Sequence, residues 1–358
     1  MYDPDFDWDE AERLLEEDSQ ATPAEPAAES PRSSSFGLVR LEKRAQWQAH
    51  DGQVNVALLE NRGEAQQAFT GCWDSASLRC WDLAQEEPSP LGELRVGGFL
   101  NAVAKLRGDT ALVAVSAGLI PTPGESLKVY SLSPPLPSPT KAESCFLHTR
   151  GCRALAVWPA PGCGELAASI SKDSLAVSRV REGGGGILAA SPVFAASNPH
   201  DMQEVTALCW QEEALLASGG TGGKVRSWDL NSAVRGTWTC SVSPGSWVRH
   251  LERCTSSGCL VVCHSDGLCW LDGRTGQSVG HVAGLGQAYA NVRISDHVRI
   301  VAFGRRLLAC DRRRLTPEAG ASAELAAAAL SLDLCAGAGG SLLVGSKDGV
   351  ATIYSVHA

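Results

Sequence analysis

The sequence predicts an all-β protein built from repeated units, and two observations lead to this fold class. The first is the stretch FTGCWDSASLRCWDL (Phe69–Leu83), which reads as two alternating strands around a turn and closes on Trp-Asp. The second is its recurrence, because LLASGGTGGKVRSWDL (Leu215–Leu230) has the same order of apolar strand, small residues, turn and alternating strand. The 37 glycines and 18 prolines of the chain agree with many short strands joined by turns.

Weaker copies of this unit recur along the chain. Three of them are LAASISKDSLAVSRV, CLVVCHSDGLCWLDG and SLLVGSKDGVATIYSV, each with another alternating strand upstream. Two more are degenerate: one has a long turn containing Pro121 and Pro123, and one keeps only the alternation. The turns fall near positions 74, 124, 173, 222, 266, 305 and 348, so the sequence predicts seven units with an average period of about 46 residues.

On these residues the chain resembles the WD-repeat proteins, from roughly Phe36 to Ala358. The resemblance implies a seven-bladed β-propeller whose blades are four-stranded antiparallel sheets. The stretch FGLVRLEK (Phe36–Lys43) is a strand without a turn partner, and the last unit lacks its fourth strand. We therefore expect Phe36–Lys43 to pair with the last blade, which removes an exposed sheet edge.

The resemblance also implies a buried hydrogen-bonded chain within a blade, made by a His, a Ser or Thr, an Asp and a Trp. The matching residues are His50, Thr70, Asp74 and Trp81 in the first unit, His148, Ser169 and Asp173 in the third, and His200, Ser218 and Trp228 in the fourth. The first unit has a turn one residue longer than usual, the third has Ser178 in place of Trp, and the fourth has Gly222 in place of Asp. A buried Asp needs hydrogen-bond donors, so we expect these residues to be structural and Asp74→Ala to destabilise the fold.

The net charge of −9 lies at one end of the chain. Residues 1–35 contain 11 acidic and two basic groups, so 2 − 11 = −9, and the rest of the chain is neutral. The Pro, Ser, Ala and Glu content of this acidic tail is typical of disorder. A short helix near residues 7–17 would place Trp8, Leu14 and Leu15 close together, with Phe6 just upstream. Two hypotheses stay open: the tail folds onto the groove of a partner, or it only keeps the protein in solution.

The remaining sequence features exclude several classes of function. The neutral body has no basic excess, so direct binding of nucleic acid is not expected, and no segment has the length and apolarity for membrane insertion. The 13 cysteines lack paired zinc-ligand spacing and no export signal precedes them, which indicates reduced thiols in the cytoplasm or the nucleus. The sequence shows no phosphate-binding loop, so no cofactor and no metal are expected.

The function that the resemblance implies is that of a non-enzymatic interaction scaffold or adaptor subunit of a multiprotein complex. The binding face would be formed by the loops before each first strand and after each second strand. The partner-binding candidates are Trp73, Phe99, Lys172, Trp247, Arg249, Tyr289 and Lys347 on this face, and Phe6, Trp8, Leu14 and Leu15 in the tail. The alternatives are a substrate receptor of a ubiquitin ligase, for which the expected Arg after Trp-Asp is missing, and a propeller enzyme, for which no catalytic constellation is visible.

Overall fold

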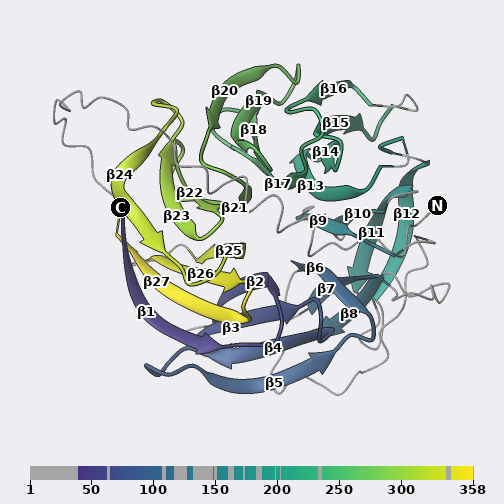
Figure 1. The fold of residues 1–358 in the computed structure, drawn as a ribbon. Helices are drawn as coiled ribbons and strands as arrows, with labels where there is room; N and C mark the ends of the chain where they lie inside the picture. Colours follow the sequence, from purple (N-terminus) through teal and green to yellow (C-terminus); the bar gives the residue numbers. More distant parts are fainter. Residues whose placement is uncertain are drawn as a thin grey trace, which may run out of the picture. The chain divides into compact units, whose positions relative to one another are not determined.

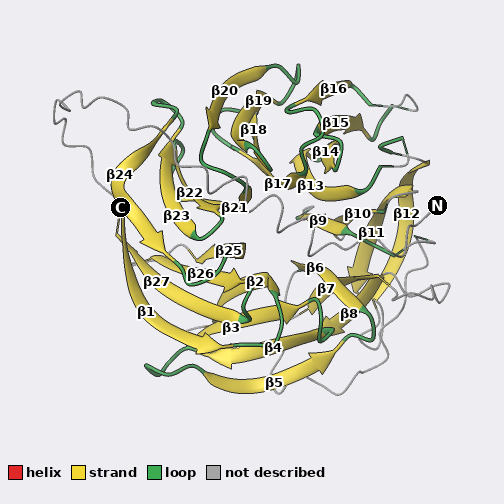
Figure 2. Cartoon of the chain, viewed as in Figure 1, coloured by secondary structure: helices red, strands yellow, loops and turns green. Residues whose placement is uncertain are grey.

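The computed structural model describes most of the chain after residue 38, and every regular element in it is a β-strand (Figures 1 and 2). The described residues are 39–62, 65–106, 110–116, 127–131, 148, 151–159, 165–171, 174–182, 188–197, 199–201, 203–232, 236–335 and 340–357.

The strands form seven antiparallel sheets, numbered here in chain order. Sheet 1 contains β2 (Val54–Arg62), β3 (Ala65–Cys72), β4 (Ser77–Asp82) and β5 (Ser89–Arg95). Sheet 2 contains β6 (Phe99–Lys105), β7 (Thr110–Ser116) and β8 (Leu127–Ser131). Sheet 3 contains β9 (Ala154–Trp158), β10 (Glu165–Ile170), β11 (Ser174–Glu182) and β12 (Leu188–Ser197). Sheet 4 contains β13 (Val205–Glu212), β14 (Leu215–Gly220), β15 (Lys224–Asp229) and β16 (Trp238–Ser241).

Three further sheets complete the arrangement. Sheet 5 contains β17 (Val248–Arg253), β18 (Cys259–His264), β19 (Gly267–Asp272) and β20 (Ser278–Ala283). Sheet 6 contains β21 (Ala288–Arg293), β22 (Val298–Phe303), β23 (Arg306–Asp311) and β24 (Thr316–Glu324). Sheet 7 contains β25 (Ala329–Cys335), β26 (Gly340–Ser346), β27 (Val350–His357) and β1 (Arg40–Gln48).

The sheets are arranged as a β-propeller. Their first strands, β2, β6, β9, β13, β17, β21 and β25, contact one another in this order, and β25 contacts β2 in turn, so these inner strands surround the centre (Figure 1). The prediction of an all-β propeller is therefore confirmed.

The prediction of seven four-stranded blades needs a correction. Six sheets are complete four-stranded blades, whereas sheet 2 has three strands among the described residues. The stretch that follows β8 reads LSPPLPSP, and proline cannot donate a hydrogen bond to a strand ladder. The sequence predicted a degenerate second unit at this place, and six complete four-stranded blades are present among the described residues.

Strand β1 closes the last sheet, as the unpartnered N-terminal strand predicted. It pairs antiparallel with β27, from Arg40 opposite His357 to Gln48 opposite Val350, with one irregularity between Lys43 and Ala45. The predicted strand Phe36–Lys43 is thus confirmed for its last four residues. The pairing continues five residues further because alternation of exposed and half-buried side chains persists to the end of β1, and residues 36–38 lie outside the described range.

The hydrophobic core lies between neighbouring sheets. At the seam of sheets 5 and 6, Trp270 and Leu268 pack with Val301 and Phe303 in one buried cluster. The second strands of sheets 5 and 7, β18 and β26, are buried along almost their whole length because a neighbouring sheet covers each face, and they accordingly read as nearly continuous apolar runs. This packing fixes the starts of the inner strands relative to one another.

Candidate functional site at the starts of the inner strands

A buried hydrogen-bonded chain runs through sheet 1. His50 Nε2 lies 3.0 Å from Thr70 Oγ1, and the indole Nε1 of Trp81 donates to the same oxygen at 2.8 Å. The other ring nitrogen, His50 Nδ1, lies 3.4 Å from Ser77 Oγ. Burial lowers the pKa of His50 to about 4, so the ring is neutral and each nitrogen has a hydroxyl partner.

Asp74 does not belong to this chain, contrary to the prediction. It is exposed, and its Oδ2 accepts a hydrogen bond from the backbone N–H of Gln53 at 3.1 Å. The physical reason is the extra residue in the turn, which is accommodated with a φ of +51° at Ala76 and leaves the carboxylate at the surface. Ser77 takes the place next to the histidine that the sequence assigned to Asp74.

Sheets 3 and 4 each contain part of the same arrangement. His148 lies between two hydroxyls, with Nε2 2.8 Å from Ser169 Oγ and Nδ1 2.7 Å from Ser174 Oγ. His200 Nε2 lies 2.7 Å from Ser218 Oγ, which also accepts from Trp228 Nε1 at 2.8 Å. Burial lowers the pKa of His200 to about 4. The predicted Asp173 lies outside the described residues.

The partner of the histidine Nδ1 is a residue that sequence reasoning missed. Ser77 and Ser174 each occupy the first position of the third strand of their sheet. Lys224 has this position in sheet 4, and within the described part of the chain His200 Nδ1 has no hydrogen-bond partner. In the sequence, both turns contain the dipeptide Asp-Ser, and this shared dipeptide could have pointed to the serine partners. It is a weak signal, because serine and threonine are common in turns.

These contacts reverse the expected ranking of substitutions in sheet 1. Thr70→Val should lower the free energy of unfolding by about 1–3 kcal/mol, because it leaves the buried Trp81 N–H unpaired. It also removes one of the two Thr70 oxygens that His50 Nε2 contacts, while the Thr70 backbone carbonyl remains at 3.0 Å. Asp74→Ala should change it by less than about 0.5 kcal/mol, as is usual for surface substitutions. Urea unfolding of both variants measures the difference. A larger loss for Asp74→Ala would contradict the exposed position of its carboxylate.

Because His200 Nδ1 in sheet 4 has no hydrogen-bond partner among the described residues, we expect one substitution to stabilise the fold. Lys224→Ser should raise the free energy of unfolding by about 0.5–1.5 kcal/mol, because a serine in this position faces the histidine Nδ1 in sheets 1 and 3. Thermal melts of Lys224→Ser and of the matched control Lys224→Ala separate the hydroxyl from the loss of the lysine. Equal melting temperatures for the two variants would refute the assignment.

Two arginines tie the loop before the histidine to the third strand. Arg79 Nη1 donates to Ala49 O at 2.6 Å, and Arg226 Nη1 donates to Pro199 O at 2.6 Å. Each arginine stands two residues before the Trp of its sheet, and each accepting carbonyl belongs to the residue before the histidine. The shared spacing in LRCWD and VRSWD was a visible signal, and sequence reasoning did not use it.

A β-bulge marks the start of six of the seven inner strands, at the second residue in five of them and at the third residue in β6. The extra residues are Asn55, Asn101, Thr206, Arg249, Tyr289 and Leu330. A bulge changes the direction of the side chain of its extra residue and interrupts the ladder of hydrogen bonds between the strands. Three of these side chains bond to the next inner segment: Asn55 Nδ2 donates to Leu100 O at 2.6 Å, Asn101 Nδ2 to Cys152 O at 2.8 Å, and Thr206 Oγ1 to Val248 O.

The bulges of sheets 5 and 6 carry larger side chains. The guanidinium carbon of Arg249 lies 4.5 Å from the ring centroid of Trp247 and 5.4 Å from that of Tyr289. All three residues are half-buried, and we call them the Trp-Arg-Tyr cluster. The sequence predicted each of them as a partner-binding candidate from its repeat position. The structure brings them together across two sheets, because bulges place Arg249 and Tyr289 at matching positions.

The other candidates are distributed around the same end of the sheets. Trp73 and Phe99 stack with ring centroids 4.2 Å apart and an interplanar angle of 13°, which joins sheet 1 to sheet 2. Lys347 is half-buried, and its backbone N–H donates to Ala328 O at 2.8 Å. The remaining candidates, Lys172, Phe6, Trp8, Leu14 and Leu15, lie outside the described residues. A role in partner binding stays a prediction for all of them.

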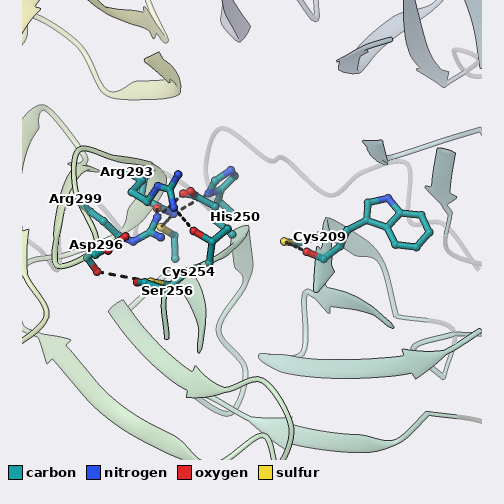
Figure 3. A network of polar contacts seen from close by, with 12 residues as sticks. Cys209, His250, Cys254, Ser256, Arg293, Asp296 and Arg299 are labelled. Carbon is teal, nitrogen blue, oxygen red and sulfur yellow. Dashed lines mark hydrogen bonds and ion pairs between the residues drawn. The ribbon is translucent and has the colours of Figure 1, made fainter. Parts of the chain in front are cut away.

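A second polar network, which the sequence did not predict, lies at the seam of sheets 5 and 6 (Figure 3). Arg299 on β22 is only 3% exposed, and its Nη1 contacts Glu252 on β17 and, at 2.5 Å, Asn291 Oδ1 on β21. Asn291 Nδ2 lies 2.8 Å from His250 Nδ1. Burial lowers the pKa of His250 to about 4 and raises that of Glu252. The corresponding residues of sheets 1, 4, 5 and 7 are buried and apolar: Ala68, Leu216, Leu260 and Leu342.

The residues that the structure describes include no group of three or more His, Cys, Asp or Glu side chains placed to hold a metal ion. Nor do they include a helix with the length and apolarity of a membrane span.

Comparisons with known proteins place the fold. No protein-family model matches the sequence, and no curated protein matches it. Among solved structures, Sqt1 from Saccharomyces cerevisiae is similar with a TM-score of 0.66 and 9% identity over 88% of this chain and 99% of that one. The WD40 β-propeller domain of Doa1 gives a TM-score of 0.67 and 16% identity over 89% and 97%. The computationally designed protein Ika8 gives 0.57 and 13% identity over 88% and 99%. From the ring of inner strands, the Trp-Asp units and these neighbours, the fold of this chain is that of the WD40 β-propellers.

Proposed function

We propose that this protein is a non-enzymatic interaction scaffold that binds another protein at the starts of its inner strands. The observation that carries the proposal is the Trp-Arg-Tyr cluster, in which Trp247, Arg249 and Tyr289 stack across two sheets. Tryptophan, tyrosine and arginine are the side chains most enriched among the energetically dominant residues of protein interfaces.

The local backbone supports this role. Arg249 and Tyr289 are the extra residues of two bulges, so packing and ladder hydrogen bonds on both sides fix their main chains. Side chains held in one arrangement lose little conformational entropy when a partner binds, which favours affinity. The neighbouring inner strands carry smaller polar residues at the same position, Asn55, Asn101 and Thr206, and use them to join sheets.

The Ser–His contacts support a structural role rather than a catalytic one. Thr70 and Ser218 each accept a tryptophan N–H and face a histidine inside a sheet, and all of these groups are buried. A nucleophile must reach a substrate, and these hydroxyls are engaged on the side that a general base would need. The contact between a hydroxyl and a histidine Nε2 recurs in three sheets, as expected for a repeated structural element.

The test is affinity purification from a cell extract, with mass spectrometry, of the full chain and of two variants. Trp247→Ala combined with Arg249→Ala should lose partners that the unchanged chain retains. Val193→Ala is the matched control, because Val193 is exposed on the outer strand β12. Thermal melts must show that both variants are folded. An unchanged partner set for the folded double variant would refute the site, and loss on Trp73→Ala alone would move it to the stacked pair Trp73 and Phe99.

The acidic tail is proposed as a second and separate binding segment, on the basis of its sequence. Its apolar residues at helical spacing suit an apolar groove with a basic rim. Replacing Trp8 and Leu15 together by Ala should remove the partners that depend on the tail, and binding to those partners should weaken with salt. If no partner is lost, the tail only keeps the protein in solution. Free thiols at the described cysteines suit a reducing compartment, and we propose the cytoplasm or nucleus.

A further inference from the structure

Two cysteines face each other at the end of the hairpin that joins β17 to β18. The register of these strands ends with Arg253 opposite Leu260, so Cys254 and Cys259 are the next pair along the ladder. The backbone N–H of Cys254 donates to Cys259 O at 2.7 Å, as expected for residues in register. Residues opposite each other in an antiparallel pair have Cα atoms about 4.5–5.5 Å apart, and a disulfide bond spans such a separation.

Both side chains lie on the face of sheet 5 that packs against sheet 6. Neighbouring residues of a strand alternate between faces, so Cys254 shares a face with Glu252, and Cys259 shares one with Val261. Glu252 contacts β22 of sheet 6, and Val261 belongs to the buried cluster between the two sheets. The thiol of Cys254 donates to Asp296 O of sheet 6 at 3.7 Å (Figure 3). The two thiols therefore leave opposite strands on the same side of the sheet.

The turn between the two cysteines contacts both sulfur atoms. Its four residues, 255–258, are exposed, and it ends on Gly258, whose φ is +65° and whose N–H donates to Cys254 O at 2.9 Å. Ser257 hydrogen-bonds to the sulfur of Cys254, and the thiol of Cys259 donates to Ser257 O at 3.8 Å. One serine of a tight turn thus has both thiols as neighbours.

Cys254 also has the chemical character of an attacking thiol. Burial acts to raise its pKa, but hydrogen bonds from Ser256 and Ser257 outweigh burial and lower the pKa of Cys254 to about 7. About half of this group is then thiolate at pH 7, and the thiolate is the nucleophile of thiol–disulfide exchange. In contrast, burial raises the pKa of four other cysteines to about 12: Cys152, Cys209, Cys263 and Cys269.

We propose that Cys254 and Cys259 form a reversible disulfide by exchange with a low-molecular-weight disulfide of the glutathione type. The Cys254 thiolate attacks one sulfur of the small disulfide, whose S–S bond breaks, and one small thiolate leaves with the electron pair. Cys259 then loses its proton and attacks the Cys254 sulfur, which releases the second small thiolate. The two cysteines lose two electrons, the small disulfide gains them, and the two cysteine protons end on the two released thiols.

The place of the pair in the fold sets the conditions and the consequence of this reaction. Cys254 is 2% exposed and Cys259 is 4% exposed, so exchange requires a local opening of the exposed turn that joins them. Oxidation removes the proton that Cys254 donates to Asp296 O, and with it a contact between sheets 5 and 6. The pair follows the last residue of β17, whereas the Trp-Arg-Tyr cluster lies at the start of this strand, so the two sites are separate.

The experiment incubates the full-length protein with mixtures of reduced and oxidised glutathione, stops the exchange by acid precipitation and labels the remaining thiols with N-ethylmaleimide in denaturant. Trypsin then releases the peptide 254–274, which contains four cysteines, Cys254, Cys259, Cys263 and Cys269. As the share of oxidised glutathione rises, Cys254 and Cys259 should lose their labels together. Mass spectrometry should then show a peptide that carries two labels instead of four and lacks two hydrogen atoms.

Three variants test the order of the steps. In Cys259→Ser the second attack is impossible, so Cys254 should accumulate a glutathione adduct that dithiothreitol removes. The rate of this adduct formation should be half-maximal near pH 7, and not near the pKa of about 8.5 of an ordinary thiol. In Cys254→Ser, Cys259 should keep its label. Cys240→Ser is the matched control, because Cys240 is half-buried and burial raises its pKa, and this variant should oxidise at 254 and 259 like the unchanged protein.

Two results would overturn the proposal. One is an unchanged protein that keeps both labels, at Cys254 and Cys259, in oxidised glutathione alone, a result that does not depend on how any variant folds. The other is Cys259→Ser that melts like the unchanged protein and yet forms no adduct at Cys254.

Discussion

Glu252→Ala should be the most damaging single substitution in the ring and should lower the free energy of unfolding by about 3–5 kcal/mol. It removes the counter-charge of Arg299, a guanidinium that is 3% exposed at the seam of sheets 5 and 6. The Glu252 side chain is 30% exposed, but its removal leaves the buried guanidinium uncompensated in a medium of low dielectric constant. Asn291 would remain as a partner, but a neutral amide does not replace the carboxylate. Chemical denaturation monitored by tryptophan fluorescence measures the loss.

The double replacement of Glu252 by Val and Arg299 by Leu is the informative control. Apolar residues occupy the Arg299 position in four other sheets, so the double variant should recover most of the stability that Glu252→Ala loses. A loss below about 1 kcal/mol for Glu252→Ala would show that the carboxylate does not compensate the arginine in solution.

Acid should destabilise the ring strongly between about pH 6.5 and pH 4. Burial lowers the pKa of four histidines to about 4: His50, His200, His250 and His264. In the unfolded chain a histidine has a pKa near 6.5, so the unfolded state takes up protons first as the pH falls through this window. The stability that the neutral rings contribute is therefore complete above about pH 6.5 and is lost on the way to pH 4.

The expected loss in the free energy of unfolding is large, because the contributions of the four histidines have the same sign. A lowering from 6.5 to about 4 corresponds to on the order of 3 kcal/mol for one fully buried histidine. Burial raises the pKa of Glu252 and Asp333, and these two acids oppose the trend in part. Urea unfolding at intervals from pH 8 to pH 4 tests the prediction. A flat profile between pH 7 and pH 4.5 would contradict the lowered pKa values of these four rings.

The repeated fold was predictable from sequence because its signals are local. Trp81 and Trp228 end strands whose alternation is plain, and glycine- or serine-rich turns precede them. The pairing of the N-terminal strand with the last sheet was also predictable. Phe36–Lys43 had no neighbouring turn, and the last unit was one strand short. The partner of His50 was not predictable, because one additional turn residue moved Asp74 outward and left Ser77 in its place.

Features that depend on contacts between sheets could not be predicted from the sequence. Nothing in VRIVAF distinguishes Arg299 from a solvent-facing arginine, because its partners come from β17 and β21, and one of them stands 47 residues earlier. The Trp-Arg-Tyr cluster is an intermediate case. Repeat positions assigned its members to one face, but bulges bring them into contact, and a bulge leaves no mark on the composition of a strand.

The pairing of β1 with β27 also constrains how the protein is made. About 300 residues separate Gln48 from Val350, so β1 leaves the ribosome long before its partner is synthesised. At a typical elongation rate of 5–20 residues per second, the delay is roughly 15–60 s. During this time Leu41 and Trp47, which are half-buried in the finished ring, have no partner strand. The last sheet therefore closes only after β27 has been synthesised, and until then the edge of β1 is open to pairing with other chains.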